Sequence, residues 1–236
     1  MTTRDVCDAA GLQAPIPGTR EVNMFNDAKD PRALTQRLMR EATGARVIWD
    51  FDGVVGHTEP LHEASYRELA SRRGYVFGAD FFDDLVGHTE QWIWERVISE
   101  GFPAGMNEIP LLHRERGDVV ADLALGSLEP SWLAATLMPA FAPVAEDQVV
   151  VSNGDPDLIT ALLAQWDLGA FVDVGRRALG RDKEVLFRTL CVPPCVVLED
   201  SDAYLSLARE HGAFTVGVRH SHNSRAALDA DITTYL

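Results

Sequence analysis

The stretch that most constrains the fold of this chain is a short apolar run, residues 46–51, that ends in two acids. A mostly apolar run of this length is typical of a strand buried on both faces of a sheet. Asp50 and Asp52 lie one residue apart at its end, and Gly53 then permits a sharp turn. Because the chain leaves the strand here, both carboxylates can face a pocket at the carboxyl end of the sheet. Two acids at such a position favour a bound cation, and magnesium prefers oxygen ligands of this type.

Taken alone, that motif fits a plain turn after a strand equally well, so the rest of the chain decides between the two interpretations. Short strand-like runs recur at residues 148–152, 171–174, 195–200, 213–218 and 231–235. Helical patterns separate most of them, and one begins at Asp155 and Pro156, a typical cap followed by a typical first helical residue. This alternation predicts an α/β fold, a Rossmann-like doubly wound parallel sheet with helices on both faces.

One segment, residues 57–139, interrupts the alternation with a helical pattern. Its helices are predicted at residues 61–73, 89–100, 111–125 and 132–137. We therefore expect an all-helical domain inserted after the first strand, and an α/β core made of residues 45–56 and 140–236. Residues 1–44 are expected to form an N-terminal helical extension, in which Pro31 starts a helix that Gly44 ends.

Polar residues stand at the ends of several predicted strands. Ser152 and Asn153 follow the second strand, Glu199 and Asp200 end the fourth, and Lys183 follows the third at the start of a helix. Each has an ordinary alternative, since a serine there is commonly a helix cap and an isolated lysine is commonly a surface group. Functional groups of parallel sheets gather at the carboxyl ends of the strands, so together these residues predict one site.

Composition narrows the classes of partner. A net charge of -15 argues against nucleic acid and against an acidic membrane surface, because both require a basic protein surface. No apolar run is long enough to span a bilayer, and the first residues lack the apolar stretch of a signal peptide. Three cysteines indicate a reducing compartment, so we predict a cytoplasmic protein in which Cys191 and Cys195 are ordinary buried thiols.

From residue 45 to its end, the chain resembles the haloacid dehalogenase (HAD) superfamily of phosphohydrolases. Within that superfamily it is similar to the β-phosphoglucomutase and phosphoglycolate phosphatase group, which carries a helical cap after the first motif. The motifs that carry the resemblance are residues 50–55, residues 152–153, Lys183 and residues 199–201. The resemblance implies an enzyme, a magnesium-dependent phosphatase that hydrolyses a small phosphorylated metabolite through an aspartyl-phosphate intermediate.

The resemblance also implies roles for the residues. Asp50 would be the nucleophile, Asp52 the acid and base, and Lys183 the cation that neutralises charge between Asp50 and the phosphate. The implied phosphate ligands are Ser152 and Asn153. The implied magnesium ligands are Asp50, the backbone carbonyl of Asp52, Glu199 and Asp200.

Departures from the family pattern bear on the substrate. His57 stands where the family often has an acid, and Tyr204 where it usually has glycine. Residues 57–139 contain 6 Lys and Arg against 14 Asp and Glu, a net charge of -8 that disfavours a bisphosphate. Glu90 stands at a position that is basic in β-phosphoglucomutases, whereas His62 fits the mutase pattern or is a surface histidine.

Two alternatives to a phosphatase stay open at this stage. The protein could be a phosphosugar mutase of the β-phosphoglucomutase type, or a non-catalytic phosphate-binding module. Independently of its function, it could form a homodimer. Trp92 and Trp94 could offer aromatic area to a neutral or cationic leaving group. They could equally pack the interior of the helical segment, which is the preferred interpretation for Trp92.

Overall fold

The computed structural model describes residues 31–78, 81–84, 89–173, 183–223 and 228–236. It contains one five-stranded parallel sheet in the order β2-β1-β3-β4-β5. The strands are β1 (Arg46–Trp49), β2 (Asp147–Val150), β3 (Cys195–Glu199), β4 (Phe214–Arg219) and β5 (Ile232–Tyr235). The α-helices are α1 (Pro31–Ala42), α2 (Glu59–Arg72), α3 (Glu90–Ser99), α4 (Ile109–Ser127), α5 (Trp132–Phe141), α6 (Pro156–Gln165), α7 (Lys183–Leu190) and α8 (Asp202–Glu210). The predicted α/β class with a parallel sheet is confirmed.

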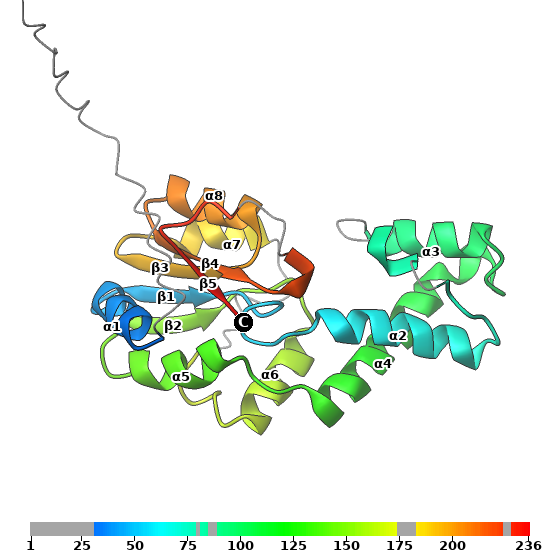
Figure 1. The fold of residues 1–236 in the computed structure, drawn as a ribbon, viewed down its shortest axis with the longest axis horizontal. Coiled ribbons are helices and arrows are strands. Elements are labelled where there is room, and N and C mark those ends of the chain that lie inside the picture. Colours follow the sequence, from blue (N-terminus) through cyan, green and yellow to red (C-terminus); the bar gives the residue numbers. More distant parts are fainter. Residues whose placement is uncertain (1–30, 79–80, 85–88, 174–182, 224–227) are drawn as a thin grey trace, which may run out of the picture.

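Helices cover both faces of the sheet (Figure 1). Helices α1, α5 and α6 lie on one face and α7 and α8 on the other. The alternation of side chains along β1 explains this arrangement, because Val47 and Trp49 point to the first layer and Ile48 points to the second. β1 is the second strand of the order and is paired on both sides, so its apolar run is buried on both faces.

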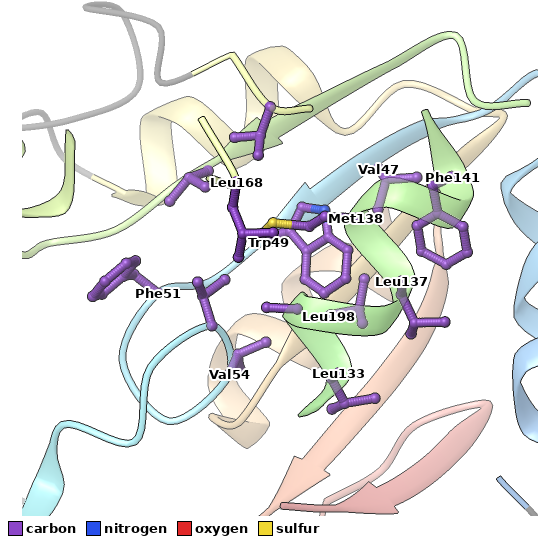
Figure 2. Close-up of a cluster of buried hydrophobic side chains, with 14 of the residues drawn as sticks. Val47, Trp49, Phe51, Val54, Leu133, Leu137, Met138, Phe141, Leu168 and Leu198 are labelled. Atoms are coloured by element: carbon purple, nitrogen blue, oxygen red, sulfur yellow. The ribbon is translucent and has the colours of Figure 1, made fainter. Parts of the chain in front are cut away.

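The larger hydrophobic cluster fills the space between β1 and α5 (Figure 2). The rings of Trp49 and Phe141 are 5.9 Å apart, and Met138 lies beside Trp49. The indole N–H of Trp49 donates to the side-chain oxygen of Gln148 on the neighbouring strand at 3.1 Å. Burial of α5 in this cluster attaches the helix to the sheet, although most of the helix falls within the segment 57–139.

The other helices of that segment pack mainly with one another. Helices α2, α3 and α4 lie together to one side of the sheet (Figure 1), and α2 and α4 contact each other over much of their length. A separate aromatic cluster holds them, with Tyr66, Trp94 and Phe102 among its buried members. Thr89 caps α3 by accepting a hydrogen bond from the backbone N–H of Trp92. No strand occurs in the part of this segment that the structure describes.

Three expectations need correction or restriction. Of the strand predicted at 171–174, the structure describes residues 171–173, and these form a single bridge, between Asp173 and Val149, with the backbone N–H of Asp173 donating to Gln148 O at 2.8 Å. The helix predicted from residue 61 begins two residues earlier, at Glu59. Residues 1–30 lie outside the described residues, whereas α1 packs on the sheet through Leu34 and Leu38.

The prediction for two of the cysteines agrees with the structure. Cys191 and Cys195 are buried free thiols. Among the described residues, the structure contains no helix with the length and hydropathy that crossing a membrane requires.

Candidate active site

The turn after β1 brings both of its acids to the end of the sheet. Asp50 is 6% exposed, and its Oδ1 accepts a hydrogen bond from the backbone N–H of Phe51 at 2.8 Å. Gly53 adopts a φ of 71°, a conformation that favours glycine. A Cβ at this position would collide with the carboxylate of Asp200 and would lie 2.8 Å from His220 Nε2. Glycine is therefore required at position 53 both by the turn and by the close approach of the Asp200 carboxylate.

Lys183 joins the ends of β1 and β3. Its Nζ lies 2.7 Å from Asp50 Oδ1 and 2.8 Å from Glu199 Oε2, and all three side chains are almost completely buried. Burial raises the pKa of Asp50 well above its usual value, the charge of Glu199 raises it further, and Lys183 opposes both. Burial lowers the pKa of Lys183, but the charges of Asp50 and Glu199 outweigh it and the net direction is upward. The lysine is thus held as a buried cation between two acids.

Three carboxylates meet beside this cation. Asp50, Glu199 and Asp200 each offer an oxygen within 4.8 Å of the others, and this is the group of three that the described residues provide for a metal ion. Glu199 is turned inward, since its Oε1 accepts the backbone N–H groups of Asp200 at 3.2 Å and Ser201 at 3.1 Å. An all-oxygen set of this kind fits magnesium, which prefers carboxylate ligands.

Asp52 points to a second group of polar residues. Its Oδ1 accepts a hydrogen bond from Thr58 Oγ1 at 2.7 Å, and its Oδ2 lies 3.4 Å from Ser152 Oγ. Ser152 is fully buried and accepts the backbone N–H of Gly154 at 2.9 Å, just before Asp155 caps α6. The structure therefore brings Asp52 and Ser152 together, whereas the adjacent Asn153 is exposed.

The sequence interpretation missed two residues that hold Asp200. His220 Nε2 lies 2.8 Å from Asp200 Oδ2, and Asn223 Nδ2 donates to the Asp200 backbone oxygen at 3.1 Å. Asn223 Oδ1 also accepts the backbone N–H of His220, so the three residues form one hydrogen-bonded unit. His220 follows β4 directly, and its place at a strand end was the signal that could have identified it.

His62 and Glu90, the two candidates in the helical segment, both contact a residue that the sequence did not single out. Arg116 on α4 binds Glu90 Oε1 at 2.6 Å and lies 3.3 Å from His62 Nδ1. It also donates to Ser65 at 3.2 Å. Burial opposes ionisation of Glu90, but the hydrogen bond and charge of Arg116 outweigh it and lower the pKa of Glu90.

One suggestion about the tryptophans is wrong for Trp94. Its side chain is fully buried within the aromatic cluster of the helical segment, and its indole N–H donates to Glu90 at 3.3 Å. Trp92 is partly buried and packs against the same cluster, as its preferred interpretation states. Position on the helix explains the difference, since Trp94 shares a face with Val97 and faces the interior.

Two curated proteins are similar to the chain over most of its length. The β-phosphoglucomutase of Bacillus subtilis is 25% identical over 187 residues, which cover 73% of this chain and 82% of that protein. The fructose-1-phosphate phosphatase YqaB of Escherichia coli is 28% identical over 185 residues, which cover 74% of this chain and 96% of that protein. No family model matches the chain.

Solved structures identify the fold. A HAD hydrolase of family IA, variant 3, from Entamoeba histolytica superposes with a TM-score of 0.63 at 17% identity, covering 80% of this chain and 92% of that one. A β-phosphoglucomutase-like structure from Thermotoga maritima superposes with a TM-score of 0.62 at 20% identity, covering 81% and 94%. The chain therefore has the HAD fold, which confirms the resemblance of its motifs at the level of architecture.

Proposed function

We propose that the protein is a magnesium-dependent phosphatase that hydrolyses a small phosphate monoester through an aspartyl-phosphate intermediate. The observation that carries this proposal is the contact of Lys183 Nζ with both Asp50 and Glu199, beside three carboxylates whose oxygens lie within 4.8 Å of one another. A buried nucleophile, a fixed cation and an oxygen ligand set at one sheet edge are the parts that phosphoryl transfer requires.

In the first step, a carboxylate oxygen of Asp50 attacks phosphorus and the bond to the leaving oxygen breaks. Asp52, protonated, gives its proton to that oxygen, and its contacts with Thr58 and Ser152 orient it for this role. In the second step, water attacks the phosphorus of the intermediate. Asp52 takes a proton from the water, and the bond to Asp50 breaks to release phosphate.

Charge neutralisation accompanies both steps. Lys183 compensates negative charge between Asp50 and the phosphoryl oxygens, while Ser152 and Asn153 would supply hydrogen bonds to them. Asp50, Glu199 and Asp200 would hold the magnesium ion, which supplies positive charge for the phosphoryl group when it is bound. The backbone carbonyl of Asp52 is a further ligand in this proposal.

Helices α2, α3 and α4 would serve as the cap. They join the core through residues 56–58 and 128–131, two connections that pair with each other at Gly56 and Pro130. The backbone N–H of Ser131 also donates to Val55 O at 2.8 Å, so the two connections form one short hinge. Since α5 packs with the sheet, we limit the moving part to these three helices.

A monophosphate whose remaining part is neutral or cationic is the substrate class that we infer. Arg116 is a cation in the described cap, but Glu90 binds it at 2.6 Å and cancels its charge. The segment 57–139 as a whole has 6 Lys and Arg against 14 Asp and Glu. A second phosphate would meet net negative charge there, which disfavours its binding. A sugar monophosphate of the kind named for the Escherichia coli relative fits this class.

Release of phosphate from p-nitrophenyl phosphate tests the proposal. We expect turnover that requires magnesium, that EDTA abolishes and that Asp50→Asn removes. Asp118→Asn is the matched control, because Asp118 is an exposed acid on α4 and its variant should retain turnover. No magnesium-dependent release from this ester or from a panel of phosphorylated metabolites would refute the phosphatase. Calorimetric binding of inorganic phosphate without turnover would then favour the non-catalytic module.

A phosphosugar mutase is the second candidate. The observation that favours it is His62, which fits the mutase pattern and which the contact with Arg116 holds in place. The two candidates differ in their preference between a monophosphate and the matched bisphosphate of one sugar. A tenfold higher kcat/KM for the bisphosphate, about 1.4 kcal/mol of transition-state binding, would favour the mutase and contradict the charge argument.

A further inference from the structure

The ammonium group of Lys183 has a third partner besides its two acids. Its Nζ lies 4.4 Å from the centroid of the Tyr204 ring, over the face. The ammonium also forms ion pairs with Asp50 at 2.7 Å and with Glu199 at 2.8 Å, and the centroid of the Phe187 ring lies farther away, at 5.9 Å. A cation within about 6 Å of an aromatic centroid is attracted by the ring, most strongly when water is excluded.

Packing holds the Tyr204 ring in this place. Tyr204 lies in the first turn of α8, four residues after Asp200, which directly follows β3. Its ring lies 5.5 Å from the ring of Phe187, which is fully buried one helical turn after Lys183 on α7. The two rings and the lysine therefore link α7 to α8 at the point where the acids emerge.

We propose that Tyr204 is a positioning residue for Lys183, in which the ring face attracts the ammonium group and holds it in contact with Asp50 and Glu199. A small residue at this position would remove that attraction from a buried site, where it is strongest. A third carboxylate would also attract the ammonium group, but it would add negative charge where a phosphate must bind.

A ring face also imposes little direction on the donor. The ammonium group can therefore turn an N–H from the ring to a phosphoryl oxygen that arrives at Asp50, while it keeps its ion pairs with the two carboxylates. This role rests on the phosphatase proposed above, but the contact between Lys183 and Tyr204 can be tested without any activity.

Lysine spectroscopy provides that test, because the chain has only two lysines, Lys29 and Lys183. In protein labelled with ε-¹³C-lysine, the ε-methylene proton signal of Lys183 should lie upfield of that of Lys29, since the ring shields protons above its face. Loss of one signal in Lys183→Met assigns it. We expect the upfield shift to persist in Tyr204→Phe and to become much smaller in Tyr204→Leu, in which only the more distant Phe187 ring, 5.9 Å from Nζ, remains. Equal positions for the two lysines in the wild-type protein would overturn the proposal without any variant.

Kinetics then test the positioning role. At saturating magnesium, Tyr204→Leu should lower kcat about tenfold with little change in KM or in the half-saturating magnesium concentration. Tyr204→Phe should recover most of that loss, because it restores the ring. As a matched control, Phe82→Leu removes a ring 4.6 Å from Arg67 in the helical segment and should leave kcat within twofold of wild type.

The outcomes separate this inference from the proposed function. If Tyr204→Phe were as impaired as Tyr204→Leu, the hydroxyl group would be responsible and the role of the ring face would be wrong. Unchanged kcat in Tyr204→Leu would also overturn it. A shifted Lys183 signal in a protein with no phosphatase activity would support the contact while refuting the phosphatase.

Discussion

Replacing Lys183 by methionine should destabilise the protein severely. Methionine has a similar shape but no charge, so the change leaves Asp50 and Glu199 without the cation that lies 2.7 and 2.8 Å from them. Their side chains are 7% and 0% exposed, and water therefore cannot replace the lost partner. Removing one partner of a buried ion pair costs about 3–5 kcal/mol.

Thermal unfolding in EDTA measures this cost. For a chain of this size 1 kcal/mol shifts Tm by about 2–4 °C, so we expect a fall of about 6–20 °C at pH 8. The fall should be smaller at pH 5. Burial and Glu199 raise the pKa of Asp50 above its value in the unfolded chain, so the folded variant binds more protons in that range. Its stability therefore falls as the pH rises.

Arg188→Met is the matched control on the same helix. Arg188 pairs with Glu184 at 2.6 Å, but both side chains are more than half exposed. An exposed pair contributes at most about 1 kcal/mol, so the control should lose only a few degrees. Equal losses in the two variants, or a larger deficit of Lys183→Met at pH 5 than at pH 8, would refute this account of the buried charges.

The remaining predictions concern four acids. Asp50→Asn should abolish phosphate release, because an amide is a poor nucleophile, and Asp52→Asn should abolish it while calorimetry still detects magnesium binding. Asp200→Ala should raise the magnesium concentration for half-maximal activity at least tenfold in a metal titration, and an unchanged value would contradict its role as ligand. Glu90→Gln should lower Tm at pH 7, because it removes the charge that pairs with Arg116. Arg116 lowers the pKa of Glu90 in the folded protein below its usual value. The difference in Tm from wild type should therefore vanish as the pH falls through the pKa of Glu90 in the folded protein.

Much of the architecture could be predicted because it depends on local patterns. The apolar run before Asp50 is buried on both faces because neighbouring strands pair with it on both sides. Asp155 caps α6 as its sequence indicates, by accepting the backbone N–H groups of Asp157 and Leu158. Chain direction in a parallel sheet then brings the strand ends together, so the acids after β1 and β3 could be assigned to one site without knowing their distances.

Contacts between distant residues depended on the tertiary structure. Periodicity indicates that Trp94 or α5 has a buried face, but it does not say which element covers that face; α5 packs on the sheet and Trp94 packs within the helical segment. Arg116 and Glu90 lie on different helices, and only the packing of α3 against α4 pairs them.

Lys183 shows most clearly the difference between what the sequence predicts and what the tertiary structure decides. Its sequence position predicted a cation near Asp50, a residue 133 positions earlier in the chain. The sequence did not predict the ring of Tyr204 beside the ammonium group of Lys183, because side-chain direction depends on how α7 and α8 pack. Local patterns thus determined which groups reach the edge of the sheet, and packing between separate elements decided which atoms touch there.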